Sequence, residues 1–450
     1  MSDVTSSAPH ISSPTFREAL TVWGRIGLLS FGGPAAQIAV MHRILVDEKG
    51  WLEERRFLPA LNFCMLLPGP EAMQLATYAG WRLHGVAGGL AAGLLFVVPG
   101  AIVMLVLTVL YMLYGALPLA VAVFTGIKAA VLAIVIQALM RVARRALSGG
   151  VDWAIATAAF VAIFFLGVPF PIIIALAALA GYLLRRDAVV AQSAHVPPRD
   201  VAASAIDAAG WRADDTHSTI RTALVWLTVW LAPIAALAIV LGTGHILVEI
   251  GLFFSKLAVV SFGGAYAVLS YMAQEVVQRY GWLNPGEMLD ALGLAETTPG
   301  PLILVTEFVG GLAAGRASGE LSVTGAIAGA LVTLWATFAP CFLWIFAGAP
   351  FVERINAEPR LRSALRGVTA AVVGVIANLT VWFTLHVLFR EVVTRDVGFL
   401  RLTLPDVTTL DPVATILSAL AALMIFGAGA GVFTTLAISG GLAWLATLAM

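Results

Sequence analysis

The sequence predicts an all-α integral membrane protein that consists of two inverted-topology repeats, with broken or re-entrant helical hairpins and about 10–13 membrane segments. Three observations lead to this prediction: the composition, the long apolar runs and an internal duplication. Of the 450 residues, 60% are hydrophobic and only 12% are charged. A soluble domain is about a quarter charged, so the composition is typical of a membrane protein.

Apolar runs that are long enough to cross a bilayer recur along the chain. They are continuous and lack the alternation of barrel strands, so we expect helices. The clearest runs lie at 88–114, 119–140, 223–241, 323–346 and 367–388.

Composition also excludes several functional classes. The formal net charge is zero, so no basic field favours nucleic acid. Cys64 and Cys341 are isolated in apolar segments, which favours packing over a disulfide or a metal site. No HExxH, GxSxG or His/Cys cluster is present, so we expect neither enzymatic activity nor a metal or other cofactor. The expected partner is the lipid bilayer, and a homodimer is left open.

The chain aligns with itself at an offset of 231 residues. SFGG at 30–33 falls on SFGG at 261–264, and PGP at 68–70 falls on PGP at 299–301. Over positions 30–80, 17 of 51 residues are identical, against roughly 4 expected by chance, which indicates a repeat. After an insertion the offset becomes 241 and pairs Gly126 with Gly367.

Domain boundaries follow from the duplication and from one polar stretch. We expect a disordered N-terminus without a signal peptide at 1–15, a first repeat at 16–186, a cytoplasmic linker at 187–219, a connecting helix at 220–242 and a second repeat at 246–450. Arginines in the linker and at 141–145 place both regions in the cytoplasm. An odd number of crossings then separates equivalent points, so the repeats should face opposite ways.

Glycine and proline interrupt the apolar stretches 16–41 and 57–80, and do so again in the second repeat. Each stretch is either a broken spanning helix or a re-entrant hairpin. Such backbone is tolerated at membrane depth only where protein buries it or where it lines a polar cavity. Amides at the start of a half-helix favour an anion, although exposed carbonyls could hold a cation. The candidate backbone residues are Gly32, Gly33, Pro68, Gly69, Pro70, Gly263, Gly264, Pro299, Gly300 and Pro301.

Two cations occupy equivalent positions. Arg25 and Lys256 each lie five residues before an SFGG segment. Charge within a membrane is expensive and often marks a substrate pathway, which makes both candidate anion ligands. The alternative is snorkelling to the interface.

Other polar residues lie near the interruptions. Glu71, Glu296 and Glu307 are candidate proton carriers, and Glu71 is also a candidate substrate ligand; the alternative role is helix capping. Gln74 and Asn62 are candidate hydrogen-bond donors to an oxyanion or simply packing residues. Lys128 is either another anion contact or a paired structural charge.

These motifs resemble a known family. FGGP (31–34), GWLEERRF (50–57), LLPGPEAMQLATYAG (66–80) and FVVPG (96–100) are similar to the first half of the chromate ion transporter family. SFGGAYAVL (261–269) and ALGLAETTPGPLILVTEFVGGLAAG (291–315) are similar to the second half of its long, two-domain members. Ala265 and Leu302 depart from the first-half pattern, which has Pro34 and Glu71 at these places.

The resemblance implies a protein of the inner (plasma) membrane that exports chromate, confers chromate resistance and uses the proton motive force. Chromate is a tetrahedral dianion, and a site for it barely distinguishes sulfate. Sulfate or another oxyanion therefore stays open as the substrate, and an anion channel stays open as the mechanism.

Overall fold

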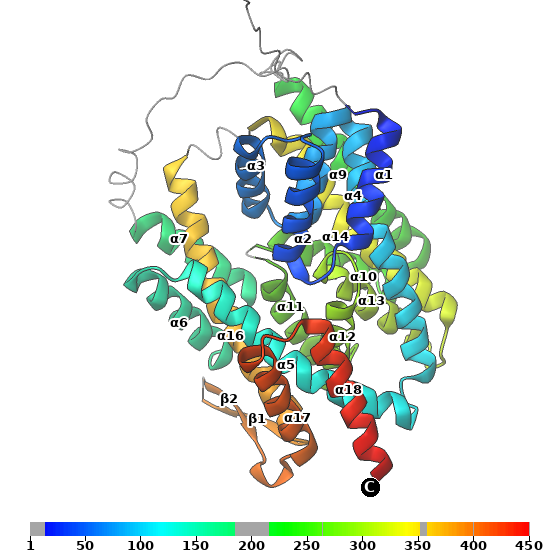
Figure 1. Ribbon diagram of the computed structural model, residues 1–450, viewed down its shortest axis with the longest axis vertical. Coiled ribbons are helices and arrows are strands. Elements are labelled where there is room, and N and C mark those ends of the chain that lie inside the picture. Colours follow the sequence, from blue (N-terminus) through cyan, green and yellow to red (C-terminus); the bar gives the residue numbers. More distant parts are fainter. Residues whose placement is uncertain (1–13, 185–215, 263, 352–357, 399, 450) are drawn as a thin grey trace, which may run out of the picture.

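The computed structural model describes residues 14–184, 216–262, 264–351, 358–398 and 400–449 (Figure 1). The first half contains α1 (Phe16–Leu29), α2 (Gly33–His42), the π-helical turn η1 (Arg43–Glu48), α3 (Glu54–Leu66), α4 (Glu71–Tyr114), α5 (Pro118–Ala146), α6 (Gly150–Phe164) and α7 (Phe170–Leu184). The connecting helix is α9 (Thr216–Leu241). It begins before residue 220, where the sequence placed its start, and most of the predicted linker and N-terminus lies outside the described residues.

The second half repeats this order of helices and adds a β-hairpin and several short turns. It contains α10 (Ile246–Val260), α11 (Ala265–Gln274), the π-helical turn η2 (Glu275–Arg279), α12 (Pro285–Thr297), the 3₁₀ turn η3 (Leu302–Leu304), α13 (Val305–Arg316), α14 (Val323–Gly348), the 3₁₀ turn η4 (Ala349–Phe351), α16 (Pro359–Leu388), strands β1 (Val392–Val397) and β2 (Leu400–Pro405), the 3₁₀ turn η5 (Val407–Thr409), α17 (Pro412–Ala422), the π-helical turn η6 (Leu423–Gly427) and α18 (Val432–Ala449).

Long apolar helices form the frame of the molecule. Five helices in the described residues are long and apolar enough to cross a membrane: α4, α5, α9, α14 and α16. Four shorter apolar helical segments lie at 150–164, 170–184, 412–427 and 432–448. The predicted helical membrane fold is confirmed.

The helices around the SFGG and PGP segments are too short to span. Helix α1 has 14 residues, α2 has 10 and α3 has 13, whereas a span needs about 20. Helix α4 is two helices, because His84 and Gly85 leave helical geometry in its middle. The piece at 71–83 is therefore another short segment. Figure 1 shows α1, α2 and α3 in the upper part of the view, with α12 below them.

Equivalent positions adopt the same local structure. Gly50 and Gly281 both have positive φ, of 60° and 63°. The backbone N–H of Trp51 bonds to the carbonyl of Leu45, and that of Trp282 bonds to the carbonyl of Val276. Each of these bonds follows a π-helical turn, η1 or η2. The duplication seen in the sequence therefore extends to the hydrogen bonds of the backbone.

The two halves exchange their last helices. Helices α6 and α7 of the first half pack on α16 of the second, and α17 and α18 of the second half pack on α5 of the first. Glycine permits both contacts: a Cβ on Gly126 would lie 2.0 Å from the Ser439 carbonyl oxygen, and one on Gly367 would lie 2.3 Å from that of Ala177.

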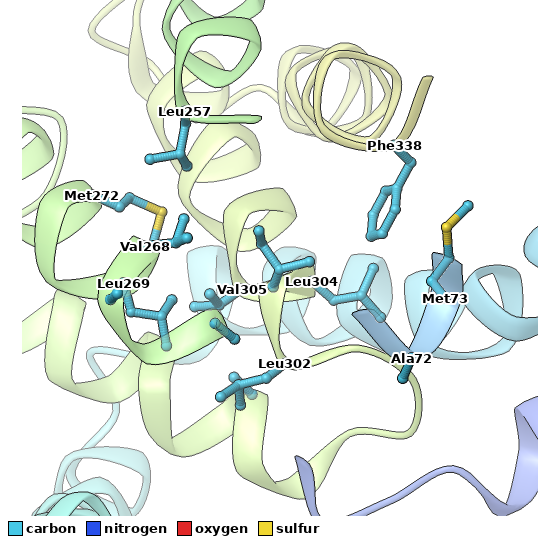
Figure 2. Close-up of a cluster of buried hydrophobic side chains, with 14 of the residues drawn as sticks. Ala72, Met73, Leu257, Val268, Leu269, Met272, Leu302, Leu304, Val305 and Phe338 are labelled. Carbon is cyan, nitrogen blue, oxygen red and sulfur yellow. The ribbon is translucent and has the colours of Figure 1, made fainter. Parts of the chain in front are cut away.

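A buried apolar cluster joins the halves near the PGP segments. Figure 2 shows Leu304 and Val305 between Met73 of α4 and Val268 and Leu269 of α11. All five side chains are at most 1% exposed. Close-packed apolar contacts of this kind hold the short helices together where backbone hydrogen bonding is interrupted.

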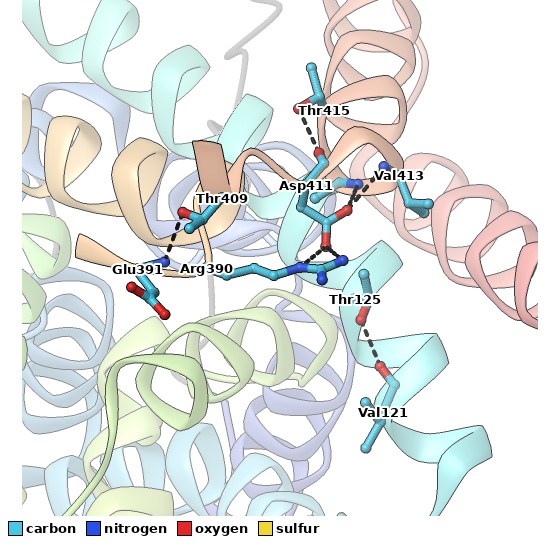
Figure 3. A network of polar contacts seen from close by, with 9 residues as sticks. Val121, Thr125, Arg390, Glu391, Thr409, Asp411, Val413 and Thr415 are labelled. Atoms are coloured by element: carbon cyan, nitrogen blue, oxygen red, sulfur yellow. Dashed lines mark hydrogen bonds and ion pairs between the residues drawn. The ribbon is translucent and has the colours of Figure 1, made fainter. Parts of the chain in front are cut away.

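A small β-hairpin is the one departure from the predicted all-α fold in the described residues. Strands β1 and β2 pair antiparallel, with Val392 opposite Pro405. β-branched residues at 392–394 favour a strand, and Gly398 with φ of 64° lies in the turn. Asp411 caps α17 and accepts hydrogen bonds from Arg390, which fixes the hairpin to the bundle (Figure 3).

We expect Gly126→Ala to destabilise the protein by about 1–3 kcal/mol, because the new methyl group overlaps the backbone of α18. Gly441→Ala, which has nothing within 4 Å of the new Cβ, is the matched control. The Tm of the two purified variants in detergent measures the difference. Equal Tm values would contradict the close approach of α5 and α18.

Candidate anion site

Each SFGG segment ends a short helix in the same way. Ser30 ends α1 and Ser261 ends α10, and their hydroxyls donate to the carbonyls of Ile26 and Ala258 at 2.6 and 2.7 Å. Left-handed glycines then turn the chain: Gly32 has φ of 81° and Gly264 has φ of 96°. Glycine suits these positions because a side chain is strained there. Gly263, also a predicted site residue, lies outside the described residues.

Each PGP segment separates two short helices. Gly69 and Gly300 have positive φ, of 119° and 83°. Pro70 directly precedes α4, as the sequence predicts, so α4 begins with free amides. Pro301 instead precedes η3, and α13 starts at Val305, four residues after Pro301. The two helix starts therefore differ in shape.

The SFGG segment of one half bonds to the PGP segment of the other. The N–H of Gly300 donates to the Ser30 carbonyl at 2.7 Å, and the N–H of Gly69 donates to the Ser261 carbonyl at 3.0 Å. The two bonds are equivalent at the 231-residue offset. A reciprocal pair of contacts is what a two-fold relation between the halves produces. We call the region of these two bonds the junction.

Side chains and backbone pack tightly at the junction. Gln37 donates to the Gly300 carbonyl at 2.6 Å, and Gln74 donates to the Pro68 carbonyl at 2.7 Å. A Cβ on Gly69 would lie 2.8 Å from Nε2 of Gln74 and 2.9 Å from Sγ of Cys341. In this conformation the junction is closed, with apolar side chains beside it (Figure 2).

The three candidate carboxylates have different surroundings. Glu71 starts α4, and a Cβ on Gly264 would lie 3.9 Å from its Oε1, so this first-half residue reaches the second SFGG segment. Glu296 is buried and accepts a hydrogen bond from the Tyr266 hydroxyl at 2.7 Å. Glu307 is fully buried, and neither oxygen has a hydrogen-bond partner among the described residues.

The structure gives the two candidate cations other neighbours. Arg25 is 52% exposed and forms an ion pair with Glu48 at 3.0 Å. Lys256 is exposed, and its Nζ lies 5.7 Å from the ring centroid of Tyr271. These contacts do not support the prediction that both side chains meet at one anion site, since each points to the exposed side of its helix.

A polar cluster around the buried Asp290 also links the halves, and the sequence singles out only Lys128 among its members. Lys128 of α5 forms an ion pair with Asp290 of α12 at 3.3 Å, and the Tyr111 hydroxyl donates to Asp290 at 2.7 Å. Lys128 is therefore a paired charge. The acidic partner could not be identified from the sequence because it comes from the other repeat, 162 residues away.

Comparison with known proteins identifies the family of this chain. The family model described as "Chromate transporter" matches residues 17–182 and 248–445, one stretch in each half. The chain belongs to the chromate transporter family. Together with the five apolar helices, this membership makes it a multi-pass membrane protein, with the inner (plasma) membrane as the location typical of such bacterial transporters. Membership also indicates a transporter rather than an enzyme.

Curated relatives of this chain are similar over most of their length. It is 33% identical to a chromate transport protein of Pseudomonas aeruginosa, over 79% of this chain and 78% of the relative. It is 30% identical to a probable chromate transport protein of Synechococcus elongatus, over 79% and 81%. It is 28% identical to a chromate transport protein of Cupriavidus metallidurans, over 84% and 86%. No solved structure matches this chain.

We expect Gly300→Ala to slow transport about tenfold, because a side chain at this positive φ costs about 1–2 kcal/mol and shifts the backbone that donates to Ser30. Gly319→Ala is the control: its φ of 81° imposes the same strain, but nothing lies within 4 Å. Initial rates of labelled chromate flux in membrane vesicles compare the two. An equal loss in both variants would show that strain alone, rather than the junction, is responsible.

Proposed function

We propose that this protein is a secondary transporter that exports chromate from the cytoplasm by alternating access, driven by the membrane potential or the proton motive force. The observation that carries the proposal is the reciprocal pair of hydrogen bonds at the junction. It brings the interrupted helices of both halves to one place. The substrate comes from the relatives: two are named chromate transport proteins and a third is named a probable one.

We further infer that the two repeats face opposite ways across the membrane. Helices α5 and α16 are equivalent at the offset of 241. Yet the end of α5 lies beside the start of α16, because Arg366 bonds to Ser148 and, at 3.2 Å, to Asp152. Equivalent helices that run in opposite directions are what an inverted repeat gives. Inverted repeats in transporters place the substrate site at the repeat interface, which here is the junction.

The interrupted backbone suits a tetrahedral dianion. Chromate holds water tightly, and moving it into a dry site is costly unless donors replace its hydration shell. Amides at the start of α4 and around the glycines provide such donors. The junction must open to use them. Each hydrogen bond across it contributes only about 0.5–1.5 kcal/mol net, so a rocking motion can exchange these bonds for bonds to substrate.

Electrical driving favours export. Moving one charge across 100 mV is worth about 2.3 kcal/mol, so a dianion that leaves a negative cytoplasm gains about twice that. Uptake would need co-transported cations. The buried carboxylate of Glu307, which has no hydrogen-bond partner in the part of the chain that the structure describes, is our candidate for carrying a proton, because an ionised group in such surroundings is costly.

We expect labelled chromate to accumulate in inside-out vesicles when the lumen, which corresponds to the cell exterior, is made positive. Imposing the opposite potential should abolish accumulation. Flux that is independent of voltage would contradict electrogenic export and favour electroneutral exchange.

Unlabelled sulfate tests the substrate range by competition with labelled chromate. Counterflow driven by preloaded chromate separates a carrier from a channel, since a channel shows none.

We expect Glu307→Gln to retain voltage-driven flux but to lose the response to a pH gradient at zero potential, because the amide keeps the shape of the side chain and cannot carry a proton. Glu320→Gln, at an exposed position in the loop after α13, is the control. Initial rates with and without the pH gradient provide the measurement. An unchanged pH response in Glu307→Gln would exclude this residue as the proton carrier.

A further inference from the structure

A basic cavity of about 550 Å³ lies between α3, the end of α5 and the first turns of α16. Three arginines line it: Arg145, Arg362 and Arg366. None of the lining residues that the structure describes is acidic. The volume falls in the usual range of ligand sites and leaves room for an oxyanion with part of its hydration shell.

The three arginines are not equally engaged. Arg366 donates a hydrogen bond to Ser148 and forms an ion pair with Asp152, whose side chain is 1% exposed. Arg145 and Arg362 form no ion pair with any residue that the structure describes, so their charge is available to a ligand. Asn62, Ser148 and Thr369 add neutral polar groups to the wall. Guanidinium groups with neutral donors are well suited to an oxyanion because they present several N–H groups in a planar fork.

The cavity adjoins the junction. Leu66 and Phe262 line it. Leu66 lies two residues before the first PGP segment, and Phe262 follows Ser261, which accepts the hydrogen bond of Gly69. An anion in this cavity is therefore next to one of the two exchanged bonds that hold the junction closed.

A second cavity, of about 490 Å³, occupies the related place at the other exchanged bond. It is lined by Thr297, the repeat equivalent of Leu66, and by Phe433, whose ring contacts that of Phe31, the equivalent of Phe262. Helix α5 supplies Leu119, Val123 and Ile127 to its wall. None of its lining residues is charged. The basic character is thus confined to one of two related cavities.

We propose that Arg145 and Arg362, with Arg366 held in place by Asp152, form a loading vestibule that binds a tetrahedral oxyanion dianion before the junction opens. The arginines at 141–145 place this end of α5 in the cytoplasm, so the vestibule takes up substrate from the cytoplasmic side. This proposal rests on the proposed function and names the residues that bind the exported oxyanion first.

Sulfate binding to the purified protein in phosphatidylcholine nanodiscs tests the vestibule by titration calorimetry. Sulfate is used because it does not oxidise protein thiols. We expect Arg145→Gln and Arg362→Gln each to raise the Kd about tenfold or more, because each removes a charged donor. Arg362→Lys, which keeps the charge, should lose less than Arg362→Gln. Arg144→Gln, at an exposed position in the same turn of α5, should bind as the wild type does.

Transport gives a second readout. In inside-out vesicles the two glutamine variants should show a KM for chromate raised by a similar factor, with the maximal rate retained. Unchanged Kd and KM in both variants would overturn the vestibule while leaving chromate export intact. Wild-type protein that binds sulfate through these arginines but moves no chromate would instead overturn the proposed function and keep the vestibule.

A lipid headgroup offers the same phosphate chemistry, and the nanodisc composition distinguishes it. If phosphatidylglycerol discs abolish sulfate binding to the wild type, and the glutamine variants no longer retain that lipid, the cavity is a lipid site and the proposal is wrong. Sulfate affinity that is unchanged by phosphatidylglycerol supports the loading vestibule.

Discussion

The structure depends on one constraint: every interrupted helix inside a bilayer leaves backbone groups that need partners, because lipid offers none. In this protein two of these partners come from the other repeat. Gly300 of the second PGP segment bonds to Ser30 of the first SFGG segment, and Gly69 bonds to Ser261. A buried donor left without a partner costs about 1–3 kcal/mol, so neither half can satisfy its own interruptions alone. The exchange of α6 and α7 for α17 and α18 reinforces this mutual dependence.

The same constraint separates a rigid frame from a part that can move. The second piece of α4, together with α5, α14 and α16, consists of long apolar helices with extensive contacts. The short helices around the junction are held by two exchanged backbone bonds, by Gln37 and by apolar contacts such as those of Leu304. Apolar contacts are not directional, so they can slide, whereas the hydrogen bonds must be exchanged for others. In the proposed alternating-access mechanism, opening of the junction therefore calls for a ligand that accepts hydrogen bonds, which an oxyanion does.

Much of this arrangement could be predicted from the sequence, because the relevant signals are local. Composition and run length indicate spanning helices, and glycine next to proline indicates interruptions. The unpredicted features are long-range or depend on side-chain direction. Nothing near Gly69 indicates that its partner is Ser261 rather than Ser30, and nothing near Lys128 indicates Asp290. The equivalence of Arg25 and Lys256 predicts that both face the site. Equivalence fixes only the position along a helix, however, and the structure pairs Arg25 with Glu48.

The two halves share a backbone plan but differ in chemistry. Glu71, Gln37 and Gln74 in the first half correspond to Leu302, Val268 and Val305 in the second, and arginines line only one of the two related cavities. Such asymmetry cannot set the net direction of a passive carrier, since direction follows from the concentration gradient and the voltage. It sets the affinity on each side. In our proposal, a basic cytoplasmic vestibule lets the carrier fill at low internal oxyanion concentration, and the apolar cavity at the other exchanged bond does not hold the released dianion. In the proposed mechanism, export at low internal concentration depends on the voltage and on this difference in affinity.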